Sequence, residues 1–160
     1  MIYVLMGVLM AAILLIVTVL LRNAPAWTAA PGIAVRLTTY LRTHQANLVT
    51  DAVFSELEAP RLQMNAEQSS QRIRQTVKQL GWRVQEDRLP TGVLHAVAAS
   101  PLLHFQDDIR VSIQGKGNAS IISAESRSRI GQADFAANAG HLYLFKQLLI
   151  DPSLTTHRSD

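Results

Sequence analysis

The chain has 160 residues, which is enough for one small domain once an apolar N-terminal segment is set aside. It contains no cysteine, which excludes disulfides, thiolate catalysis and cysteine-ligated metal centres. Of its 15 Lys and Arg residues, Arg22, Arg36 and Arg42 lie before residue 46, where there is no acid. The other 12 therefore balance the 12 Asp and Glu. A near-neutral domain argues against nucleic-acid binders, which carry a basic stripe on the folded part.

The run from Ile2 to Leu21 carries no charged side chain. At about 1.5 Å per residue, its roughly 20 residues span about 30 Å as a helix, the thickness of a bilayer core. A core helix would show a polar face, and a signal peptide has basic residues before a shorter apolar run. We therefore predict a transmembrane anchor over residues 1–22 whose partner is the lipid bilayer. Cleavage after the small residues 23–26 is the alternative.

Flanking charge indicates the orientation of this anchor. Arg22 and Arg36 follow the apolar run, and only the α-amino group precedes it. The positive-inside rule then favours a single-pass protein with a cytoplasmic domain. Trp27 stands where an interfacial aromatic would mark the helix end.

Residues 23–45 are predicted to be a linker with two prolines and a short amphipathic segment. Ile33, Leu37 and Leu41 recur at helical spacing, together with Tyr40. Two interpretations stay open. In one, the helix lies on the membrane and Arg22, Arg36 and Arg42 meet anionic headgroups, each worth about 1 kcal/mol. In the other, the helix packs on the domain.

The domain is predicted over residues 46–150. Residues 47–65 are expected to be irregular or to hold short strands, with a helical turn near Phe54. A helix is predicted over residues 67–80, because Ile73, Val77 and Leu80 share one face. Gly81 suits its C-terminal end.

Four strands are predicted next, over residues 82–89, 92–100, 107–113 and 119–126. The second is apolar on both faces, as in a central strand, and the last two flank a glycine-containing turn and predict a hairpin. A helix over 133–150 and a frayed tail over 151–160 complete the chain. We predict an α+β fold: an N-terminal transmembrane helix, then a two-layer sandwich of a mainly antiparallel four-stranded sheet and two helices.

Polar side chains gather near residues 107–108 and from 126 into the last helix. They define a candidate polar pocket of Asp107, Asp108, Ser126, Arg127, Ser128, Arg129, Asp134 and Asn138. In a structural interpretation, Asp134 caps the last helix, Gly131 supplies a positive φ, and the arginines pair with the aspartates. In a functional interpretation, the arginines bind an anionic ligand or the carboxylates bind a cation.

The sequence contains no complete catalytic constellation. Asp107 and Asp108 are strand neighbours and point to opposite faces, which argues against paired-carboxylate chemistry. The five histidines have no metal-ligand spacing, and no serine lies in a GxSxG setting. We predict no catalytic residue, no metal and no cofactor.

The C-terminal half resembles the domain of unknown function 1499 family. That family carries Phe-x-Asp-Asp, a strand, and then Arg-Ser-x-Ser-Arg-x-Gly-x-x-Asp-x-x-x-Asn. In this chain the residues that match this pattern are Phe105, Asp107, Asp108, Ser126, Ser128, Arg129, Gly131, Asp134 and Asn138. The resemblance extends more loosely to residue 46. It implies a bacterial or plastid-type protein, often membrane-associated, and brings no activity.

Three positions depart from the family pattern. Glu125 replaces the first arginine, His141 stands where an arginine often follows, and Leu48 replaces a common cysteine. From the apolar anchor, the near-neutral domain and the lack of a complete catalytic constellation, we predict a membrane-tethered binding or assembly module with an unknown protein partner, in a bacterial cytoplasmic membrane. The alternative is an enzyme or ligand sensor using Asp107, Asp108, Arg129 and Asp134.

Overall fold

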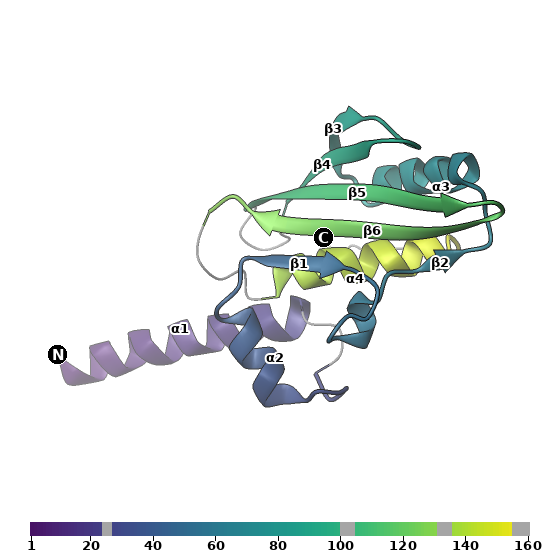
Figure 1. Ribbon diagram of the computed structural model, residues 1–160. Coiled ribbons are helices and arrows are strands. Elements are labelled where there is room, and N and C mark those ends of the chain that lie inside the picture. Colours follow the sequence, from purple (N-terminus) through teal and green to yellow (C-terminus); the bar gives the residue numbers. More distant parts are fainter. Residues whose placement is uncertain (24–26, 100–104, 131–135, 155–160) are drawn as a thin grey trace.

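The computed structural model describes residues 1–23, 27–99, 105–130 and 136–154 (Figure 1). Two helices, α1 (Ile2–Asn23) and α2 (Ile33–Tyr40), precede the domain. The domain contains α3 (Ala66–Gln79), α4 (Ala137–Ile150) and a short 3-10 helix at Ser55–Leu57. Its strands are β1 (Gln45–Leu48), β2 (Arg61–Leu62), β3 (Arg83–Asp87), β4 (Val93–Ala99), β5 (Gln106–Lys116) and β6 (Ala119–Ser128).

The six strands form one antiparallel sheet in the order β1-β6-β5-β4-β3, with β2 also paired to β6. The prediction of an antiparallel α+β sandwich is confirmed, but the predicted number of four strands was wrong. The additional strands β1 and β2 have 4 and 2 residues. Segments this short carry no readable alternation of their own, and they form because the long strand β6 offers a free edge to each of them.

Both domain helices cover the same face of the sheet, which Figure 1 shows as the layer behind the strands. Side chains at the centre of this inner face are fully buried, among them Leu94, Ile109 and Ile122. Leu142 and Phe145 of α4 are also inaccessible to solvent. No helix of the described residues covers the outer face, so polar side chains alternate with the core residues along β5 and β6.

The boundaries of the two predicted domain helices differ slightly from those observed. In α3, Asn65 and Gln68 form a capping box, with Gln68 N donating to Asn65 Oδ1 at 2.9 Å and Asn65 N donating to Gln68 Oε1 at 3.1 Å. Gly81 has φ 68° at the end of this helix, the conformation expected for its C-terminal glycine. Helix α4 begins at Ala137, and residues 133–135 lie outside the described part.

Helix α1 is long and apolar enough to cross a membrane, a property that anchors share with signal sequences. It is not a core helix, because almost all of its side chains are exposed. The exception is its C-terminal end. There Val19 and Leu20 are 8% and 5% exposed, and Leu20 belongs to the hydrophobic core of the domain. The last turns of α1 are therefore part of the folded domain.

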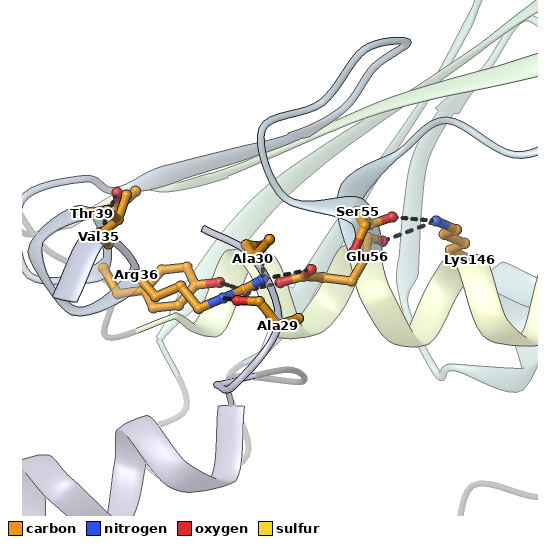
Figure 2. A network of polar contacts seen from close by, with 9 residues as sticks. Ala29, Ala30, Val35, Arg36, Thr39, Ser55, Glu56 and Lys146 are labelled. Carbon is orange, nitrogen blue, oxygen red and sulfur yellow. Dashed lines mark hydrogen bonds and ion pairs between the residues drawn. The ribbon is translucent and has the colours of Figure 1, made fainter. Parts of the chain in front are cut away.

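Arg36 fastens the segment after α1 to the domain (Figure 2). Its guanidinium donates to both carboxylate oxygens of Glu56, one through Nη2 at 3.1 Å and the other through Nη1. It also donates to the carbonyl oxygens of Ala29 at 3.3 Å and Ala30 at 3.0 Å, and its Cζ lies 4.6 Å above the ring of Phe54. We call this set the Arg36 brace.

The Arg36 brace shows that one side of the amphipathic segment packs on the domain. Arg36 and Tyr40 are 0% and 3% exposed, so this face of α2 packs on the domain. The prediction that Arg36 meets lipid headgroups was wrong, because its charge is buried and paired with Glu56. Arg42 is exposed and the side chain of Arg22 lies outside the described part, so their contact with headgroups stays a prediction.

Candidate functional site

The structure separates the candidate polar pocket into two groups on opposite faces of the sheet. Asp107 and Asp108 are neighbours on β5, and successive strand residues face opposite sides. Asp107 is 1% exposed on the inner face, whereas the Asp108 side chain is 33% exposed on the outer face. The two carboxylates therefore belong to different environments.

The inner group connects β5, β6, α4 and the residue before β1. Ser128 Oγ donates to Asp107 Oδ1 at 2.6 Å, and His141 Nε2 lies 3.1 Å from Asp107 Oδ2. Asn138 Nδ2 donates to Ser128 Oγ and to the carbonyl oxygen of His44, both at 2.9 Å. Ser126 Oγ donates to Asn138 Oδ1. We call Asp107, Ser126, Ser128, Asn138 and His141 the inner polar cluster.

The order of groups in the inner polar cluster does not suit nucleophilic catalysis. An activated serine needs a base, normally an imidazole, between its hydroxyl and the orienting carboxylate. Here the carboxylate of Asp107 lies between Ser128 and His141, and Ser128 Oγ donates directly to it. A buried hydrogen-bonded network of this kind fixes the packing of the elements that contribute to it.

The outer group is centred on Asp108. Arg129 donates to it through Nε at 3.0 Å and Nη2 at 2.6 Å, and His95 Nε2 lies 3.2 Å from its Oδ1. Arg129 Nη1 also donates to Gln106 Oε1 at 2.9 Å. The hydrogen bonds from Arg129 lower the pKa of Asp108, and the contact with His95 adds to this effect against the opposing effect of burial. Asp108 is therefore a carboxylate at neutral pH.

A groove of about 400 Å³ opens on the outer face beside this ion pair. We call it the outer groove, and its lining residues are His44, Asp108, Arg110, Glu125, Arg127, Ser128 and Arg129. The antiparallel register places Arg110 opposite Glu125 and Asp108 opposite Arg127. Within the part of the chain that the structure describes, the side chains of the exposed Arg110 and Arg127 make no hydrogen bond or ion pair.

The residues of the candidate polar pocket thus divide between the outer groove and the inner polar cluster. Asp108, Arg127, Ser128 and Arg129 line the outer groove, Ser128 also joins the inner polar cluster, and Asp134 and Gly131 lie outside the described residues. Among the described residues, no three metal-ligating side chains gather. The sequence prediction missed Arg110, Glu125 and the histidines of both groups. Counting outward from the predicted hairpin turn pairs Arg110 with Ile122, because that turn is longer than the observed one, in which Lys116 pairs with Ala119 and Arg110 comes to lie opposite Glu125.

One comparison with known proteins identifies the family. Residues 36–149 match the model of a family described as Protein of unknown function (DUF1499). No curated protein and no solved structure matches the chain. The matched region covers more than half of the chain, from Arg36 of the brace to the last turn of α4. The chain therefore belongs to the DUF1499 family.

Proposed function

We propose that this protein is a non-catalytic, membrane-tethered binding module that holds an oxyanion of its ligand in the outer groove. The observation that carries the proposal is the pair of exposed arginines, Arg110 and Arg127, which face the groove without a partner among the described residues. A guanidinium presents a planar fork of N–H donors that matches a carboxylate or a phosphate.

The charges around the groove support an anionic ligand. Arg129 and Asp108 satisfy one another through two hydrogen bonds and leave little net charge. The remaining charged lining residues are Arg110 and Arg127 against Glu125. This excess of positive charge favours an anion, and Glu125 offers an acceptor to any donor group that the ligand carries beside it. We propose a carboxylate or phosphate ligand on these grounds.

The tether rests on α1. Its apolar length suits a bilayer, and the burial of Val19 and Leu20 by the domain supports its retention in the mature protein. Cleavage after residue 26 would remove two side chains that the core uses. We propose that the protein resides in a bacterial cytoplasmic membrane with its domain on the cytoplasmic side, as the flanking arginines favour.

The alternative is an enzyme or ligand sensor that uses Asp107, Asp108, Arg129 and Asp134. One contact favours it. Asp107 lies 3.1 Å from His141, whose side chain is 12% exposed, and a carboxylate-oriented imidazole is an arrangement used by general bases. Against it, Asp107 and Asp108 lie on opposite faces, so the four residues do not share one pocket as a set.

Thermal unfolding of the full chain in detergent micelles tests the binding proposal, with inorganic phosphate and acetate as probes. A ligand stabilises the fold by RT ln(1 + [L]/Kd), about 2.7 kcal/mol at one hundred times Kd. We expect at least one of the two anions to raise the unfolding temperature in a concentration-dependent way. Because Arg127 faces the groove, Arg127→Ala should weaken this stabilisation without lowering the stability of the unliganded protein.

Arg61→Ala is the matched control, because Arg61 is also an exposed arginine on a strand but lies outside the groove. It should respond to the anions as the wild type does. If neither anion stabilises the wild type, the oxyanion proposal is wrong. An equal loss of response in Arg61→Ala would assign the effect to general charge screening instead of the groove.

A further inference from the structure

Helix α2 exposes an apolar side that nothing in the described chain covers. Ile33, Leu37 and Leu41 follow one another at intervals of four residues and are 54%, 37% and 41% exposed. Residues at this spacing lie on the same side of a helix. We call these three residues the α2 stripe. Large aliphatic side chains grouped on so short a segment mark a contact surface, since single exposed apolar residues are common but clusters are not.

The stripe is held in place from the neighbouring side of the helix. Arg36 and Tyr40 fix that side of α2 to the domain through the Arg36 brace, and the ring of Trp27 packs edge-on against Tyr40 with centroids 5.9 Å apart. The carbonyl groups of Ala29 and Ala30 are bound by the same arginine, so these two residues and α2 are fastened to the domain together. The α2 stripe is therefore a preformed surface.

The position of α2 along the chain indicates what covers the stripe. Helix α1 ends at Asn23 and α2 begins at Ile33, so the intervening residues can place α2 at most about 30 Å beyond the apolar helix. Figure 1 shows α2 at the end of the domain from which α1 emerges. The C-terminal end of α1 packs on the domain, because it contacts α4 and contributes Leu20 to the core. If α1 spans a bilayer, this end of the domain faces the membrane surface.

We propose that the α2 stripe rests on the bilayer, with Ile33, Leu37 and Leu41 inserted at the boundary between headgroups and acyl chains. Amphipathic segments bind this boundary through their buried apolar area, with basic residues assisting at the headgroups. Arg42 follows the stripe, is exposed, and suits that second role. The contact fixes how the domain stands on the membrane and hence where the outer groove faces. This proposal rests on the membrane tether proposed above.

The absence of cysteine makes a direct test available, because a single introduced cysteine can carry an environment-sensitive fluorophore. We would label Leu37→Cys and Ile33→Cys in the stripe and reconstitute the full chain in vesicles that contain anionic lipid and nitroxide-bearing lipids. Leu9→Cys in α1 is the control for a residue in lipid. Lys116→Cys, which is exposed at the end of β5 distant from α2, is the control for a residue in water.

The proposal predicts that both stripe probes emit at shorter wavelength than the Lys116 probe and that lipid-borne nitroxide quenches them, approaching the quenching of the Leu9 probe. Quenching no greater than that of the Lys116 probe would overturn it. Short-wavelength emission without lipid quenching would also overturn it, because a protein surface would then cover the stripe. An unquenched Leu9 probe would refute the tether itself, so failure of the tether is distinguishable from failure of the stripe contact.

Discussion

Replacing Arg36 by alanine is expected to lower the free energy of unfolding by about 3–5 kcal/mol, because it leaves the carboxylate of Glu56 buried without its partner. The Arg36 side chain is 0% exposed and that of Glu56 is 4% exposed, so water cannot take over the lost hydrogen bonds. For a domain of this size, the loss corresponds to a fall of roughly 10–20 °C in Tm. Thermal and urea unfolding of the full chain in detergent would measure it.

Two further variants make this prediction specific. Arg42→Ala removes an exposed arginine from the same segment and should change stability by less than about 0.5 kcal/mol. The double variant Arg36→Met with Glu56→Met removes both charges and should recover much of the loss, since apolar replacements of buried ion pairs are often neutral or stabilising. If Arg36→Ala is as mild as Arg42→Ala, the brace does not hold this segment to the domain.

Asn138→Ala is expected to have the second large effect, a loss of about 3 kcal/mol. The side chain of Asn138 is fully buried, and its removal leaves Ser126 Oγ, Ser128 Oγ and the carbonyl oxygen of His44 each without one hydrogen bond. Ser126 Oγ loses its acceptor, and a buried group left unsatisfied costs about 1–3 kcal/mol. Ser128 Oγ keeps its bond to Asp107 and the carbonyl oxygen of His44 keeps the backbone N–H of Ser128, so these two losses add less each. Chemical denaturation would measure the loss.

The matched control for this variant is Asn47→Ala, the same substitution at an exposed position on β1. It should change the free energy of unfolding by less than about 0.5 kcal/mol. A loss in Asn138→Ala as small as in Asn47→Ala would show that the inner polar cluster does not fasten α4 to the sheet. Its residues would then be available for a role in ligand binding instead.

The elements that were predicted correctly have a hydrophobic pattern and end residues that can be recognised within their own sequence. Helix α3 has a readable apolar face and a glycine at its end, and the β5–β6 hairpin has alternating apolar residues around a glycine-containing turn. The strands β1 and β2 form only because β6 is there to pair with them. No local pattern contains that information, which is why the predicted sheet had too few strands.

The contacts of the polar groups also depend on residues that are distant in the sequence. The membrane interpretation of Arg36 arises from its place in a basic, acid-free stretch, whereas its partner Glu56 is 20 residues further along the chain. The division of the candidate pocket followed from the alternation along β5, which the sequence does show. The contact of Asp107 with His141 depends on how α4 packs across the sheet, so it required the tertiary structure.

The proposed tether requires that α1 remains in the mature protein as a membrane anchor. The direct measurement is alkaline carbonate extraction of membranes from cells that produce the full chain, followed by intact mass determination. We predict that the protein stays in the membrane pellet with a mass that includes residues 2–21. A soluble protein that begins near Trp27 would contradict the tether, the membrane contact of α2 and the retention of Leu20 in the core.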